Sequence, residues 1–160
     1  MSLQMSTRGR YGLRLMVALA MHYGNGSSLL KSIAAQEEIS EKYLGQIIIP
    51  LKSAGLIISH RGAHGGYSLA RPPEDITVKD VVEAIEGAIA PVPCVDPIAG
   101  ASVGECGENP SGCERATTCV ATHVWRKLRD DIVSSLASFT LSALASEARD
   151  LGQGSENYVI

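Results

Sequence analysis

The sequence lacks several features that would assign it to a common class of protein. No apolar run approaches the roughly 18 residues of a transmembrane helix, so we expect no membrane partner. No phosphate-binding loop, paired carboxylates or nucleophile–base pair stands out, which argues against an enzyme. The apolar stretch 13–21 is short, is interrupted by Arg14 and lacks an Ala-x-Ala cleavage pattern. It therefore indicates a helix of the mature protein and not a secretory signal.

Cysteine is scarce but concentrated. All four cysteines lie between positions 94 and 119: Cys94, Cys106, Cys113 and Cys119. In a chain that we expect to be cytoplasmic, four cysteines favour metal or redox chemistry over structural disulfides. The short Cys-x-x-Cys pairs typical of structural zinc sites are absent, which argues against zinc. An iron–sulfur cluster, a zinc site and a thiol switch all remain open on this pattern alone.

The small net charge of −3 hides an asymmetry between the two halves of the chain. Residues 1–72 hold eight Lys and Arg against three Asp and Glu, whereas residues 73–160 hold six against fourteen. A basic half joined to an acidic half suggests a module that binds a polyanion. Chance patchiness explains the charge alone equally well, so this hypothesis needs support from the pattern of elements.

That pattern predicts a winged helix-turn-helix. Hydrophobic periodicity and turn residues indicate helices at 7–23, 29–36 and 41–55, followed by strands at 56–61 and 67–71. Ser40 is a suitable N-cap for the third helix, and Pro50 lies inside it. In this fold the third helix presents its N-terminal turns to the major groove of DNA.

The turn between the two strands, "GAHGG", has the composition of a DNA-contacting hairpin tip. Arg61 and His64 flank or occupy this tip, where a cation can reach a phosphate or the minor groove. Gly62, Gly65 and Gly66 suit a close approach to the DNA backbone. An ordinary surface turn is the alternative, and the three preceding helices favour the hairpin tip.

The pattern of apolar residues in the C-terminal half predicts a second function, which is association with another chain. An amphipathic helix is expected at 78–87, then an irregular Pro- and Gly-rich segment, then one long helix from about 116 to 151. Its apolar residues recur at heptad-like spacing from Val120 to Leu144. A helix of this kind needs a partner to cover it, so we expect a homodimer that reads a near-palindromic site in double-stranded DNA.

Four quoted segments resemble the Rrf2 family of bacterial transcription regulators: "MSTRGRYGLRLMVALA", "ISEKYLGQIIIPLKSAGLI", "RGAHGGYSLARPPEDITVKDVVEAIEG" and "CERATTCVATHVWRKL". The resemblance runs from about residue 5 to 140. It implies a dimeric winged helix-turn-helix repressor or activator with a long dimerisation helix. In many members the loop before that helix holds an iron–sulfur cluster, and the chain is most similar to the IscR-like members of this kind.

The resemblance also implies a set of DNA contacts. By position they are Ser40, Lys42, Tyr43 and Gln46 in the third helix and Arg61 with the adjacent glycines in the hairpin. Tyr43 suits a phosphate and Gln46 suits the N6 and N7 atoms of adenine, with a solvated polar face as the alternative for Gln46. Arg8 and Arg10 are expected to contact phosphates or to be solvated cations. Gly45 stands where the IscR pattern has Glu, which leaves the operator class open.

The cluster ligands implied by aligning the family on Trp125 are Cys94, Cys113 and Cys119, around a cluster of the 2Fe–2S type. The fourth ligand is open. IscR-like members use a histidine at the position of Thr122, whereas here His123 follows one residue later, and Cys106 is the other candidate. The family also contains the cluster-free CymR, so a regulator that acts through a thiol/disulfide switch, a zinc site or a partner protein is the alternative.

Together these patterns predict a mainly α protein with a β-hairpin wing. The expected division is a DNA-binding domain at 5–75, a connecting helix and cysteine-rich loop at 76–114, a dimerisation helix at 115–151 and a flexible tail at 152–160. The expected function is regulation of transcription in the bacterial cytoplasm, controlled by the cluster, with no enzymatic activity.

Overall fold

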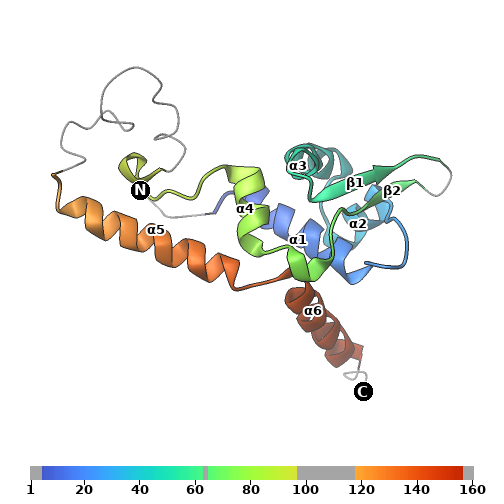
Figure 1. Cartoon of the computed structure of the whole chain (residues 1–160). Coiled ribbons are helices and arrows are strands. Elements are labelled where there is room, and N and C mark those ends of the chain that lie inside the picture. Colours follow the sequence, from blue (N-terminus) through green and yellow to red (C-terminus); the bar gives the residue numbers. More distant parts are fainter. Residues whose placement is uncertain (1–4, 63–64, 97–117, 157–160) are drawn as a thin grey trace.

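The computed structural model describes residues 5–62, 65–96 and 118–156 of the chain. The elements in chain order are α1 (Thr7–Met21), α2 (Leu30–Glu37), α3 (Glu41–Ser53), β1 (Ile57–His60), β2 (Gly66–Leu69), η1 (Pro73–Asp75), α4 (Val78–Glu86), η2 (Pro93–Val95), α5 (Ala121–Ala137) and α6 (Leu141–Glu156). The predicted class, mainly α with a two-stranded wing, is confirmed. The wing and α5 extend from opposite sides of a helical head (Figure 1).

The head is built on α1, which packs against α2, α3, α4 and α6. Ser6 caps α1 by accepting a hydrogen bond at Oγ from the backbone N–H of Gly9 (3.1 Å). Leu15 and Met16 of α1 are fully buried, as are Leu44 and Ile47 of α3. These side chains follow the spacing of about 3.6 residues per turn that places them on one face of each helix. The three predicted helices of the head are confirmed.

The two strands form an antiparallel hairpin, in which Ile57 pairs with Leu69 and His60 pairs with Gly66. The strand β2 is also joined to the loop before α2. Ser28 and Tyr67 exchange two backbone hydrogen bonds, N–H of each to the carbonyl oxygen of the other, both of 2.9 Å. The wing is therefore held to the head at two places in the sequence, through α3 and through the 27–29 loop.

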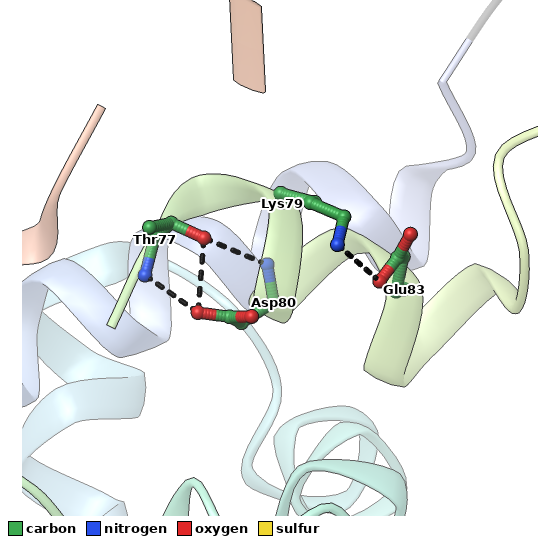
Figure 2. A network of polar contacts seen from close by, with 4 residues as sticks. All are labelled: Thr77, Lys79, Asp80 and Glu83. Carbon is green, nitrogen blue, oxygen red and sulfur yellow. Dashed lines mark hydrogen bonds and ion pairs between the residues drawn. The ribbon is translucent and has the colours of Figure 1, made fainter. Parts of the chain in front are cut away.

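The helix α4 begins with a capping box (Figure 2). The Thr77 N–H and hydroxyl both donate to Asp80 Oδ2 at 2.9 Å, and the Asp80 N–H donates to Thr77 Oγ1 at 3.2 Å. From the same first turn, Lys79 Nζ forms an ion pair with Glu83 Oε2 one turn further along the helix, at 3.4 Å. The capping box satisfies N–H groups that the first turn of a helix otherwise leaves unpaired.

The prediction of one long helix over 116–151 was wrong, because the non-helical residues Ser138–Thr140 separate α5 from α6. There the backbone pairs with the strand-like segment before α4: the Val78 N–H donates to Phe139 O and the Leu141 N–H donates to Ile76 O, both at 2.9 Å. The Thr140 hydroxyl then caps α6 by accepting from the Ala143 N–H. The helix α6 packs on α1 and continues to Glu156, so it also includes residues that were expected in the flexible tail.

The break leaves α5 alone as an exposed helix. It contacts α4 and η2, whereas α6 returns to the head and buries Leu141 and Ala145 there. Val120 is 80% exposed, Val124 61% and Trp125 37%. In the described residues, no helix combines the length and the apolar character that a membrane span needs.

Candidate nucleic-acid interface and cysteine segment

The first turns of α3 are capped and face solvent. Ser40 Oγ accepts a hydrogen bond from the Tyr43 N–H (3.2 Å), as the N-cap prediction required. The side chains of Lys42 and Gln46 lie one turn apart and are both exposed. Ser40 is exposed as well, although its hydroxyl already serves the helix. The Lys42 ammonium and the Gln46 amide therefore lie outside the core and are accessible to a DNA duplex.

Tyr43, unlike Lys42 and Gln46, packs against another helix of the head. Its side chain is half-buried, and its ring meets the Tyr11 ring edge to face, with centroids 5.9 Å apart and planes at 88°. The Arg14 guanidinium lies over the same Tyr11 ring, 5.6 Å from the centroid, and Arg14 Nε pairs with Glu37 Oε2 at 2.8 Å. Edge-to-face aromatic pairs stabilise a fixed geometry. The start of α3 is thus tied to α1 by aromatic packing.

The tip of the wing carries Arg61, which is exposed, beside a turn closed by a 2.9 Å hydrogen bond from the Gly65 N–H to Gly62 O. His64 lies outside the described residues, so its predicted role stays a prediction. Next to Arg61, His60 is exposed and its Nε2 lies 2.8 Å from Ser68 Oγ across the hairpin. The wing therefore exposes the predicted Arg61, and the exposed His60 precedes it in the sequence.

Backbone packing within the protein requires glycine at positions 65 and 66, in addition to the predicted close approach to DNA. A Cβ at Gly65 would lie 2.8 Å from His60 O. At Gly66, a Cβ would lie 2.8 Å from the Ser28 carbonyl carbon and closer still to its oxygen. Gly66 also has φ 153°, a conformation that favours glycine. The hairpin and its contact with the 27–29 loop thus require both residues.

Arg8 and Arg10 are exposed on the first turns of α1. Arg10 donates from Nη2 to Thr7 Oγ1 at 3.3 Å. It also lines an open groove between α1 and α6, together with Arg14 and Glu147. Both arginines are accessible to a phosphate.

Two of the four cysteines lie in the described residues, at the two ends of residues 94–119, which we name the cysteine segment. Cys94 is half-buried within η2, and Cys119 is half-buried just before α5. The short helix η2 packs on α5, where Arg129 Nη1 donates to Val95 O at 2.9 Å and Arg129 Nη2 pairs with Asp130 at 2.7 Å. Cys106 and Cys113 lie outside the described residues, so their predicted roles stay predictions.

The first turn of α5 separates Thr122 from His123. Thr122 is 4% exposed, whereas His123 faces solvent. The cause is the rotation of about 100° per residue on a helix. Within residues 5–62, 65–96 and 118–156, no three His, Cys, Asp or Glu side chains converge as metal ligands do. The donors at the two described ends of the cysteine segment, Cys94 and Cys119, are thiols, and soft sulfur donors are the ligands that iron–sulfur cores take, so these two residues fit such a group.

Comparison with known proteins identifies the family. Residues 5–147 match the family model Rrf2, described as an iron-dependent transcriptional regulator. The chain belongs to the Rrf2 family. Its relatives are transcriptional regulators, so the expectation that it is not an enzyme is confirmed. The resemblance to the Rrf2 family read from the four quoted segments is confirmed too. The expected greater similarity to the IscR-like members is not, because CymR of Bacillus subtilis is 40% identical and IscR of Aliivibrio salmonicida 30%.

Similar Rrf2-family proteins cover nearly the whole chain. The HTH-type transcriptional regulator CymR of Bacillus subtilis is 40% identical over 90% of this chain and 91% of its own. The solved structure titled as CymR, the global cysteine regulator of B. subtilis, has a TM-score of 0.69 and covers 91% of this chain and 98% of that one. The structure of T. potens IscR also has a TM-score of 0.69, with 37% identity over 92% of this chain and 89% of that one.

The sequence-based reading of this Rrf2-family chain missed part of the outer face of α3. Ile49 is 65% exposed there, and the exposed Lys52 donates from Nζ to Ser59 Oγ of β1 at 2.8 Å. Ile49 lies on the continuation of the face that carries Lys42 and Gln46, and Lys52 follows three residues later at the side that faces β1. Extending the helical periodicity beyond Gln46 is the signal that finds them.

Proposed function

We propose that this Rrf2-family regulator is a homodimer that binds a near-palindromic operator in the bacterial cytoplasm and whose affinity for DNA follows the state of the cysteine segment. The observation that carries the DNA-binding part is the exposed, Ser-capped start of α3 beside a wing with an exposed Arg61. Lys42 and Arg61 supply charge for phosphates, and Gln46 supplies the paired donor and acceptor that adenine requires. Arg8 and Arg10 add cations on α1.

The exposed face of α5 supports the dimer. The helix has 17 residues, hence a length of about 25 Å, and its exposed apolar side chains include Val124 and Trp125, with the exposed Val120 at its N-cap. Apolar residues gathered on one face of an exposed helix favour association, because burial removes them from water. A second copy of α5 covers this face and sets two copies of α3 at the spacing of two half-sites.

The cysteine segment supports control by an iron–sulfur cluster. Cys94, Cys113 and Cys119 are the proposed ligands, and we favour Cys106 as the fourth, because His123 faces solvent while its neighbour Thr122 is buried. Such a group, when bound, supplies a centre that responds to iron, redox state or nitric oxide. The description of the family model as iron-dependent supports the same proposal.

A series of packing contacts that begins at η2 connects the cysteines to the helices of the proposed DNA-binding head. Cys94 lies in η2, η2 packs on α5, α5 packs on α4, and α4 packs on both α1 and α3. A change at the cysteines that moves η2, held by Arg129, therefore shifts the balance between two arrangements of the head. Because the coupling is thermodynamic, the two arrangements must differ in their affinity for the operator.

A second candidate follows from the similarity to CymR, the global cysteine regulator of B. subtilis. In this version the chain regulates without a cluster, through a thiol/disulfide switch or a partner protein, and zinc is a further occupant of the cysteines. Two consequences separate these possibilities. Control by a partner protein leaves regulation intact when all four cysteines are replaced, whereas a cluster and a thiol switch both require them. A cluster differs from a thiol switch because it brings bound iron and sulfide.

The experiment that tests the cluster is anaerobic purification, followed by visible absorption spectra and assays of iron and sulfide. We expect brown wild-type protein with bound iron and sulfide, a colourless Cys113→Ala variant and an unchanged His123→Ala control. Colourless wild-type protein with stoichiometric zinc makes the site structural. Protein without either metal leaves the thiol switch or the partner protein.

A separate experiment tests DNA binding. Sequences selected from a random duplex library by the wild-type protein serve as the operator in fluorescence anisotropy. We expect Gln46→Ala to weaken operator binding about tenfold, since a bidentate base contact discriminates by roughly 1–3 kcal/mol. The control Gln36→Ala, an exposed glutamine of α2, leaves it unchanged. Equal affinity of all three proteins, or no selected sequence, contradicts the proposal.

A further inference from the structure

The middle of the outer face of α3 carries an isoleucine that the fold does not use. Ile49 is 65% exposed, whereas Ile47 and Ile48 beside it are buried in the core. Residues three and four positions apart are neighbours on a helix surface, so Ile49 lies next to Gln46 and Gly45. Its apolar side chain therefore belongs to the face that carries the proposed DNA contacts.

Gly45 is also unexplained by packing within the chain. Among the described residues, no heavy atom lies within 4 Å of a Cβ built at Gly45, and its φ is not positive. Glycine is less stable than alanine inside a helix, so the fold alone favours alanine here. Gly12 in α1 is the contrast, because a Cβ there would overlap Ile85 Cδ1. The reason for Gly45 thus lies outside the packing of the chain.

The missing side chain contributes to a shallow hollow between α3 and β1. The hollow has a volume of about 520 Å³, and its lining includes Gly45, Ile48 and Ile49 with Lys52 and Ser59 at the side of the wing. Lys52 donates to Ser59 across it. The surface is apolar along the helix and cationic beside it.

We propose that Ile49 contacts the methyl group of a thymine in the major groove and that Gly45 leaves room for the edge of that base pair. This inference rests on the proposed DNA-binding function. The C5-methyl group of thymine is an apolar group on a base edge in the major groove, and apolar side chains recognise it by contact. The amide of Gln46 one turn earlier and the cations Lys42 and Lys52 at the two ends of this face fit the polar edges and phosphates around it.

The test uses the full-length protein and the operator selected from the random duplex library. Each thymine of the operator is replaced, one at a time, by deoxyuridine, which removes only the methyl group. For wild-type protein we expect one position in each half-site at which this replacement weakens binding about fourfold, the value for one buried methyl group. For Ile49→Ala we expect the same replacement to have no effect, because the contact is already absent.

One control variant, Leu151→Ala, and one further test variant, Gly45→Ala, separate this contact from general effects. Leu151→Ala removes an exposed apolar side chain from α6, and it should retain the fourfold response to deoxyuridine. Gly45→Ala should weaken operator binding while it leaves binding to unselected DNA unchanged. If no deoxyuridine position distinguishes wild type from Ile49→Ala, the inference is overturned although DNA binding stands. If the protein selects no sequence, the proposed function fails and the inference with it.

Discussion

Replacement of Gly66 by alanine tests whether the wing is anchored to the head as the structure describes. The added Cβ would meet the backbone carbonyl of Ser28, and backbone atoms cannot move aside as a flexible side chain can. Relief of the overlap must separate the 27–29 loop from β2. That separation breaks the two 2.9 Å hydrogen bonds between Ser28 and Tyr67.

The magnitude follows from these two effects. Each hydrogen bond contributes a net value of about 1 kcal/mol to stability. The φ of 153° adds strain of about 1 kcal/mol or more for a residue with a side chain. Gly66→Ala should therefore lower the free energy of unfolding by about 3 kcal/mol. For a chain of this length, that corresponds to a Tm lower by about 6–12 °C.

The matched control is Gly62→Ala in the same turn. Gly62 also has a positive φ, 104°, but no atom of the described residues lies within 4 Å of its built Cβ. Only strain applies, so we expect a loss of about 1 kcal/mol. Thermal unfolding followed by circular dichroism, at one protein concentration, measures both. Gly66→Ala protein that melts within about 2 °C of Gly62→Ala protein would refute the assignment of Gly66 to the loop contact.

The remaining predictions concern other parts of the molecule. Thr77→Ala removes the capping box of α4 and should cost about 1 kcal/mol in urea unfolding, whereas an unchanged midpoint contradicts its role. Gly45→Ala should raise stability by about 0.5–1 kcal/mol in the same assay, and a loss would show that the fold needs this glycine. Val124→Glu places a charge on the proposed dimer face and should raise the dimer dissociation constant about a hundredfold, measured by light scattering over a range of protein concentrations. An unchanged dissociation constant would show that α5 is not the interface. Arg129→Leu removes the hydrogen bond to Val95 O, so hydrogen exchange at η2 should become faster, while equal exchange rates argue against this anchor.

The local elements of the head could be predicted from the sequence because their signals lie within a few residues. Ser40 caps α3 as expected, since the hydroxyl and the Tyr43 N–H are three residues apart. The glycine-rich turn between two strand-like segments gives the hairpin. Gly87 ends α4 at the predicted residue. The positions of Lys42, Gln46 and Arg61 on exposed surfaces follow from the same periodicity.

The C-terminal half could not be predicted in this way. The heptad-like apolar spacing continues through Ser138–Thr140, so it predicted a single helix. The break depends on backbone hydrogen bonds between Phe139–Leu141 and Ile76–Val78, which are about sixty residues away in the sequence. The exposure of His123 and the burial of Thr122 likewise depend on what α5 packs against.

Local sequence patterns are therefore enough to assign the family, the order of elements in the head and the residue types available for DNA and for sulfur ligation. These patterns are periodicity, caps and turns, which need only neighbouring residues to act. Three features come from packing between distant segments: α6 returns to α1 while α5 stays exposed, Gly66 accommodates Ser28, and Ile49 and Gly45 are free of the core. These features depend on contacts between distant segments, and the spacing of residues along one chain does not encode which segments meet.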